Sequence, residues 1–235
     1  MNCENVYRDC INVCYCADKK YEKSLQIAIN YLHRFYRDER ELKIHVLTTD
    51  SSLSVPGAEI ISIPHTCLSI AQLRVIAPIF INDKCIYLDS DTIVTTCISR
   101  LWDLSFAETT AMVVCLDMPT CKLAGDRYNI HSLKKLDRPF FNTGVIVFNC
   151  NLWRQYNMYD KCLEKFHEYR DTPSRYNDEP GINMAVDDCH ILDSTWNYNP
   201  KPPHPYRKVN IIHPYDIKLS NKPTHTLFNH NIKKT

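Results

Sequence analysis

The chain has 235 residues, of which 44% are hydrophobic and 23% are charged, and its formal net charge is +1 at pH 7. A chain of this length can bury roughly 70–75% of its unfolded surface, so one α/β domain is expected. The mixed charge, without a basic cluster, argues against nucleic acid as the main partner.

Short apolar runs alternate with helical patterns along the chain. In chain order they predict strand 11–16, helix 22–35, strands 44–48 and 60–63, helix 69–80, strand 85–88, strands 111–116 and 145–148, helices 151–169 and 181–186, and short strands 191–192 and 209–212. Pro78 is expected to end or kink its helix. Strands that alternate with helices predict one α/β domain with a mostly parallel sheet and helices on both faces.

Membrane and redox signals in the sequence favour the cytoplasm. No run of 18 apolar residues occurs, which argues against a transmembrane anchor, and the first ten residues lack the apolar core of a signal peptide. The twelve cysteines include no Cys-x-x-Cys pair, which argues against a zinc ribbon. We therefore expect reduced thiols and a cytoplasmic location.

Carboxylates follow several of the predicted strands. In α/β sheets, ligands bind at the carboxyl ends of the strands. Asp18, Asp89, Asp91 and Asp117 all lie just past a predicted strand end. We therefore expect four carboxylates along one rim of the sheet.

The stretch KCIYLDSDTIVTT, residues 84–96, has three interpretations: a turn, a nucleophile with its acid/base partner, or a metal site. Asp89 and Asp91 project to the same side of an extended chain and can reach one cation. Together with His213, which follows the run 209–212, they would suit Mn²⁺, and Mg²⁺ less well. The alternative for His213 is an ordinary surface histidine.

Two further stretches carry polar groups that could meet a substrate. In FNTG, Gly144 enters a predicted strand, which suggests close approach of a ligand or another backbone, and Asn142 could hydrogen-bond a polyhydroxylated substrate. A plain turn is the alternative. In NDEPGIN, Asn177 or Asp178 makes a good helix N-cap, which can coexist with a role in a site.

In its motifs the chain resembles glycosyltransferase family 8, the retaining GT-A type. The matching pieces, in order, are CYCADKKY, LRVIAP, KCIYLDSDTIV, CLD, FFNTGVIVFN, NDEPGINMAV, WNYN and IIH followed by NKP, and they span residues 11–223. The resemblance implies a single GT-A (Rossmann-like) domain over residues 1–235. It also implies transfer of glucose or galactose from a UDP-sugar, with Mn²⁺ as cofactor and Mg²⁺ as the alternative ion.

The resemblance also implies roles for single residues. The metal ligands would be Asp89, Asp91 and His213, and the catalytic residues Glu179 and Asp178. At the nucleotide-sugar site, the uridine and ribose would lie at Ala17 and Asp18, and the diphosphate at Arg74 and Lys222. The sugar would lie at Asp117, Asn142 and Asp178. The same site would also include Ser90, Thr143 and Gly144. The alternative for Lys222 is a solvated lysine.

Two departures from the family pattern stand out. Glu179 falls where the family usually has a glutamine, and HPYDIKLSNKPTH replaces the usual His-x-x-Gly-x-x-Lys-Pro-Trp, with Thr224 in place of the tryptophan. A carboxylate could act as a nucleophile, as in retaining glycosidases. Our hypothesis is instead a front-face displacement in which the leaving phosphate helps to deprotonate the acceptor and Glu179 stabilises positive charge at the anomeric carbon.

The acceptor cannot be read from the sequence. A protein, a glycan, a lipid-linked sugar and a polyol all remain open, and in a homodimer a tyrosine of one copy could reach the site of the other. Two rival functions also remain. One is a transferase-like fold that binds a nucleotide or a partner without turnover. The other is a haloacid-dehalogenase-type phosphatase, whose first motif resembles the apolar strand, Asp89-x-Asp91 and Thr92.

Overall fold

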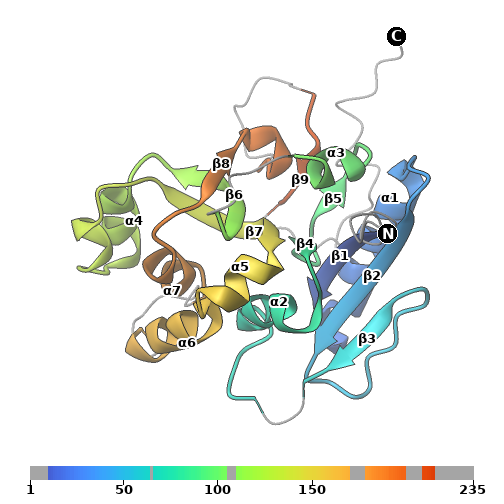
Figure 1. The fold of residues 1–235 in the computed structure, drawn as a ribbon, viewed down its shortest axis with the longest axis horizontal. Coiled ribbons are helices and arrows are strands. Elements are labelled where there is room, and N and C mark those ends of the chain that lie inside the picture. The colour runs from blue at the N-terminus through green and yellow to red at the C-terminus, as the bar shows by residue number, and fades with distance from the viewer. Residues whose placement is uncertain (1–9, 64–65, 105–109, 170–177, 200–207, 215–235) are drawn as a thin grey trace, which may run out of the picture.

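The computed structural model describes residues 10–63, 66–104, 110–169, 178–199 and 208–214, and within them seven strands form one sheet. Their spatial order is β3-β2-β1-β4-β7-β6-β8 (Figure 1). The strands are β1 (Cys10–Cys16), β2 (Glu41–Thr48), β3 (Glu59–Ser62), β4 (Lys84–Leu88), β6 (Met112–Met118), β7 (Phe140–Asn149) and β8 (His190–Leu192). Every neighbouring pair is parallel except the two made by β7. The prediction of a mixed, mostly parallel sheet is confirmed.

Helices cover both faces of the sheet, as predicted (Figure 1). The helices are α1 (Glu22–Phe35) and α3 (Ser99–Trp102) on one face, and α2 (Ala77–Phe80), α5 (Cys150–Gln155), α6 (Met158–Glu168) and α7 (Asp178–Ala185) on the other. Successive side chains of β1 point to opposite faces of the sheet, which explains this arrangement. Val13 and Tyr15 belong to the hydrophobic cluster that includes α1, whereas Cys14 belongs to the cluster that includes α6. None of the helices in these described ranges combines the length and the hydropathy needed to span a bilayer.

Several predicted helix or strand boundaries differ from the structure, and three of these differences change how an element is built. The helix expected at 69–80 is a 3₁₀ turn, Gln72–Ile76, followed by α2, and Pro78 lies in the first turn of α2, where its missing N–H costs no hydrogen bond. The helix expected at 151–169 breaks into α5 and α6, since Asn157 adopts a left-handed conformation with φ of 51°. β7 begins at Phe140, five residues before the expected strand.

A second, two-stranded sheet positions the C-terminal end of the described chain. β5 (Ile93–Val94) pairs antiparallel with β9 (Ile211–Ile212), and Ile93 lies opposite Ile212. If the same register is extended by one residue, His213 lies opposite Thr92, which directly follows Asp91 in the chain. The pairing therefore brings together residues that are far apart in the sequence.

Candidate active site

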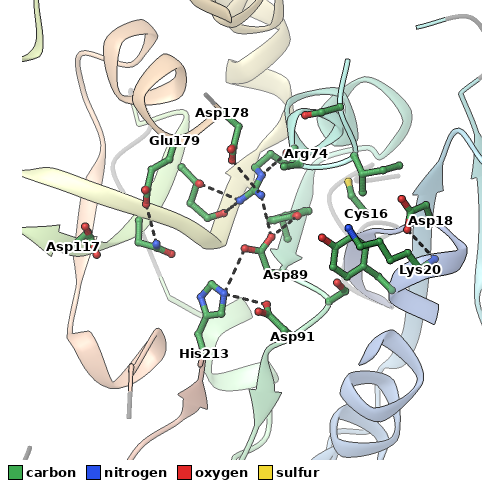
Figure 2. Close-up of a pocket in the computed structure, with 18 of the residues that line it drawn as sticks. Cys16, Asp18, Lys20, Arg74, Asp89, Asp91, Asp117, Asp178, Glu179 and His213 are labelled. Carbon is green, nitrogen blue, oxygen red and sulfur yellow. Dashed lines mark hydrogen bonds and ion pairs between the residues drawn. The ribbon is translucent and has the colours of Figure 1, made fainter. Parts of the chain in front are cut away.

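A cavity of about 560 Å³ lies at the edge of the sheet where β1 and β4 end and β7 begins. Its lining includes Asp18, Asp89, Asp91 and Asp117, so all four carboxylates expected along one rim face the same space (Figure 2). Asp117 lies inside β6 rather than after it, which corrects the predicted strand end. The antiparallel β7 adds its first residues to this edge, because Asn142 pairs with Cys115 and Val145 with Leu88.

Asp89, Asp91 and His213 form a compact cluster of potential metal ligands. Their ligand atoms all lie within 4.8 Å of one another. The Nε2 atom of His213 is 3.1 Å from Asp91 Oδ1 and 3.5 Å from Asp89 Oδ2. Burial raises the pKa of the Asp89 carboxyl, an effect that Arg74 and His213 oppose. A divalent cation among these atoms would satisfy both carboxylates and the ring nitrogen.

Gly144 makes room for this cluster. A Cβ atom at this position would lie 2.1 Å from Cε1 of His213 and 2.9 Å from Oδ2 of Asp89. The backbone of β7 therefore forms one wall behind the histidine ring, as the close approach inferred from the sequence required. Two carboxylate oxygens and one imidazole nitrogen are a donor set that fits Mn²⁺, and Mg²⁺ less well.

Arg74 links the cluster to the start of α7. Its Nη2 atom lies 3.1 Å from Asp89 Oδ1 and 3.2 Å from Asp178 Oδ2, as Figure 2 shows. Nη1 of Arg74 donates to Oγ1 of Thr143 at 3.0 Å, and the guanidinium group lies over the Tyr87 ring. Burial alone would lower the pKa of Arg74, but the surrounding groups, Asp89 first, outweigh it and raise that pKa. The charged guanidinium thus fixes two carboxylates in place.

Glu179 lies buried on α7, held by two hydrogen-bond donors. Nδ2 of Asn142 donates to Oε1 at 2.8 Å, and the Tyr128 hydroxyl donates to Oε2 at 3.0 Å. Burial raises the pKa of Glu179 to about 8, and the charges of Asp117 and Asp178 add to the shift. A carboxyl with this pKa is largely protonated at neutral pH.

Asp117 and Arg127 lie together in the cavity lining, and Asp117 interacts electrostatically with Glu179. Nη1 of Arg127, on α4 (Cys121–Tyr128), is 3.5 Å from Asp117 Oδ2. Burial raises the pKa of Asp117, and Arg127 opposes that shift. This part of the cavity thus combines carboxylates with one exposed cation.

Of the residues expected to contact the nucleotide, some line the cavity and others do not. Asp18 lines the cavity and caps the 3₁₀ turn Lys19–Tyr21 by accepting from the Lys20 N–H at 3.0 Å. Ala17 is fully buried and donates its N–H to the Leu47 carbonyl. Ser90 lines the cavity between the two metal-site aspartates. Lys222 and Asn177 fall outside the described residues.

Sequence reasoning missed several residues that shape the site. Lys20 and Tyr21 line the cavity and belong to the quoted motif CYCADKKY, but they were given no role. Arg127 and Tyr128 also line it, and nothing in their local pattern distinguishes them from surface residues. Asn197 contacts His213 and belongs to the quoted motif WNYN, to which no role was given. Only the motif itself could have drawn attention to it.

Comparison with known proteins gives a consistent family match. The family model described as "Glycosyl transferase family 8" matches residues 63–214. General stress protein A of Bacillus subtilis is 28% identical over 134 residues, which make up 54% of this chain and 44% of that protein. The match therefore covers less than half of that relative's length.

Solved structures with the same fold include two of one enzyme. The galactosyltransferase LgtC, in complex with donor and acceptor sugar analogs, is similar with a TM-score of 0.68 and 20% identity, and the match covers 86% of each chain. A second structure, of an LgtC active-site mutant in which glutamine is replaced by glutamate, also has a TM-score of 0.68. At these identities the likeness concerns the fold.

Proposed function

The chain belongs to glycosyl transferase family 8, and on this premise we propose that it is a metal-dependent retaining transferase of glucose or galactose from a UDP-sugar. Its sheet and helices have the GT-A arrangement of the similar solved structures. The single observation that carries the proposal is the convergence of Asp89, Asp91 and His213 on one point of a large cavity. A cation with three protein ligands keeps positions for a diphosphate.

Mn²⁺ is the proposed cofactor, with Mg²⁺ as a weaker substitute, because of the nitrogen ligand. When bound, the ion would act as a Lewis acid that neutralises charge on the departing diphosphate. Arg74 supports this site from within the protein, because it holds Asp89 from the side opposite to His213. Lys222 is proposed as a second point charge on the diphosphate.

The rest of the cavity is assigned to the nucleotide sugar. Asp18, with Ala17 next to it in the chain, would hold the uridine and ribose, and Ser90 would lie beside the diphosphate. The sugar would lie against Asp117, Asn142 and Asp178, with Thr143 and Gly144 forming the wall. The hydrogen-bonding groups that line this part of the cavity support the assignment, since they match a hydroxyl-rich ring.

For the chemical step we propose a front-face displacement. The bond from the anomeric carbon to the phosphate oxygen breaks while the acceptor oxygen approaches on the same face, and the acceptor proton passes to the leaving phosphate. Glu179, in its ionised form, stabilises positive charge at the anomeric carbon, and Asp178 acts beside it.

The alternative for Glu179 is a double displacement through a covalent glycosyl ester. It predicts an adduct of one hexose mass on Glu179 when the acceptor is withheld. A trapped adduct, together with complete loss of transfer in Glu179→Gln, would replace our mechanism with this one.

Further assignments complete the proposal. We propose one catalytic domain over residues 1–235 and an acceptor that is a protein, a glycan, a lipid-linked sugar or a polyol. We also propose a cytoplasmic location. A homodimer would allow a tyrosine of one copy to serve as acceptor for the other.

The test is release of UDP from a panel of UDP-sugars, with and without Mn²⁺, for the wild type and Asp91→Asn. Many transferases slowly hydrolyse their donor, so no acceptor is required. We expect Mn²⁺-dependent release from UDP-glucose or UDP-galactose that Asp91→Asn abolishes. Asp103→Asn is the matched control, because Asp103 pairs with Arg40 outside the cavity lining and its loss should leave release unchanged.

Other results would favour the rival functions. Binding of Mn²⁺ and UDP without any sugar release would support a protein that binds nucleotide without turnover. Release of phosphate from a simple phosphoester would support the phosphatase. Failure to bind either Mn²⁺ or UDP would contradict the metal-site interpretation of Asp89 and Asp91.

A further inference from the structure

Asn197 lies in the middle of a buried chain of hydrogen bonds that joins the metal cluster to Glu179. Its Oδ1 atom is 2.8 Å from Nδ1 of His213, and its Nδ2 atom donates to Oδ1 of Asn142 at 2.6 Å. Asn142 in turn donates from Nδ2 to Oε1 of Glu179 at 2.8 Å. Three hydrogen bonds, through the side chains of Asn197 and Asn142, thus connect the two ends of the site.

The backbone of β7 fixes the direction of this chain. The N–H of Gly144 donates to Oδ1 of Asn142 at 2.8 Å, so the atom at that place is an oxygen. The same oxygen accepts from Nδ2 of Asn197, which leaves the Asn197 oxygen facing His213. Since that oxygen can only accept, Nδ1 of His213 must carry the hydrogen.

This direction determines what His213 offers to the cavity. With the hydrogen on Nδ1, the neutral ring presents a lone pair at Nε2, 3.1 Å from Asp91 Oδ1. A lone pair and carboxylate oxygens repel one another unless a cation lies among them. Asn197 therefore selects the ring tautomer and orientation that a metal ion requires.

The amide nitrogen of Asn197 has a second effect, on the orientation of Asn142 beside Glu179. Because Oδ1 of Asn142 is held by Asn197 and Gly144, its amide nitrogen is turned toward Glu179. Without the Asn197 donor, the Asn142 amide would lose one of the two hydrogen bonds that fix its orientation.

The backbone around Asn197 is suited to such a role. Tyr198 forms a bridge with Ile212 and accepts a hydrogen bond from the N–H of His213 at 2.9 Å. Asn197 and His213 therefore lie on segments that are tied together next to the paired side chains. Asn197 is 6% exposed and His213 is 4% exposed, so water cannot easily replace either hydrogen bond.

We propose that Asn197 is a positioning residue of the transferase. Its side-chain oxygen orients His213 so that Nε2 faces the metal, and its side-chain nitrogen orients Asn142 toward Glu179. The inference rests on the proposed function for the existence of metal binding. It goes beyond that function in assigning both ends of the site to one amide.

The test compares Asn197→Ala, which removes both hydrogen-bonding groups, with Asn197→Asp, which keeps an oxygen toward His213 and removes the donor to Asn142. Mn²⁺ binding is measured without substrate, from the electron paramagnetic resonance signal of the free ion, and UDP-glucose or UDP-galactose hydrolysis is measured separately. Asn12→Ala is the matched control, because Oδ1 of Asn12 lies 3.1 Å from Nε2 of His45, outside the cavity lining.

We expect Asn197→Ala to raise the Mn²⁺ dissociation constant about 10–100-fold, as the loss of a second contact to a metal-binding histidine usually does. Asn197→Asp should keep Mn²⁺ affinity near that of the wild type while kcat for hydrolysis falls. Asn12→Ala should leave both values unchanged.

Two results would overturn the inference: wild-type Mn²⁺ affinity in Asn197→Ala, or an equal loss of Mn²⁺ affinity in Asn197→Asp. If circular dichroism shows that Asn197→Ala does not fold, the Mn²⁺ affinity and kcat of the near-isosteric Asn197→Asp variant decide the test. If the wild type binds no Mn²⁺, the proposed function fails first, and this inference falls with it.

Discussion

At the scale of single residues, the site depends on carboxyl groups in very different surroundings. Asp89 is balanced by Arg74 and His213, whereas Glu179 is held by the neutral donors Asn142 and Tyr128. Neutral donors offset the burial of a charge less well than an ion pair does. Burial and the nearby charges of Asp117 and Asp178 raise the pKa of Glu179 to about 8, so this carboxyl can change its protonation near neutral pH.

The pH dependence of donor hydrolysis should therefore report on Glu179. Its pKa is raised to about 8, so the carboxyl is mainly protonated at pH 7 and ionised at pH 9. Since the proposed mechanism uses the ionised form, UDP release by the wild type should rise between pH 7 and pH 9. Initial rates at saturating Mn²⁺ would measure this, and Glu179→Gln should remove the rise.

A suitable control is Glu164→Gln, because Glu164 is an exposed glutamate of α6 and should keep the wild-type profile. Wild-type activity that falls above pH 8 would contradict the mechanism. It would show instead that the protonated acid, which resembles the glutamine common in the family, is the active form.

At the scale of the elements, one asparagine joins α7 to β7. Asn183 accepts from the Phe141 N–H at 3.1 Å and donates to the Phe141 carbonyl at 2.8 Å, so its side-chain amide pairs with the backbone as a neighbouring strand would. It is fully buried. Because Glu179 lies on the same helix, this contact also fixes the distance between Glu179 and Asn142.

Asn183→Ala should destabilise the fold strongly. The substitution would leave two buried backbone groups of Phe141 without a partner, at a cost of roughly 2–4 kcal/mol. Urea denaturation followed by circular dichroism would measure the change in the free energy of unfolding. Asn151→Ala, which removes an exposed asparagine of α5, should change it little. Equal stability of the two variants would contradict this account of Asn183.

The elements also show what local sequence can and cannot predict. The strands β1, β2 and β4 and the helix α1 follow from their apolar patterns, and Asp89-x-Asp91 could be recognised at a strand end. The break at Asn157 depends on a single left-handed residue. The register shifts between β6 and β7 beside Asp117 depend on pairing between distant strands. Neither feature has a periodic signal.

The same limit applies to the candidate site. Asp89, Asp91, Asn142 and Glu179 lie in motifs with several characteristic neighbours. Tyr128 and Asn197 act through contacts with residues 51 and 16 positions away, and such contacts exist only in the folded chain. Residues that orient other residues are therefore the ones that the sequence conceals.

At the scale of the whole molecule, metal and nucleotide should bind only to the folded state. The ligand set joins two residues of the loop between β4 and β5 with the residue after β9, and no unfolded chain would hold these three groups together. A ligand at 100 times its dissociation constant then stabilises the folded state by about 2.7 kcal/mol.

Mn²⁺ with UDP should therefore raise the melting temperature, and EDTA should reverse the increase. Differential scanning fluorimetry of the wild type and Asp91→Asn would measure the effect. The increase should depend on UDP concentration and should be absent in Asp91→Asn. An equal increase in both proteins would place the binding outside the proposed metal cluster.

The pairing of β5 with β9 has a consequence for the time course of folding. His213 follows Asp91 by about 120 residues, and closing so long a loop costs more conformational entropy than the local contacts of β1 with α1. Contacts of high sequence separation tend to form slowly. During synthesis on the ribosome, most of the central sheet can emerge and assemble while His213 is still in the exit tunnel. The three potential metal ligands would then come together only after β9, the last strand among the described residues, has docked, so the metal cluster would be completed late in folding.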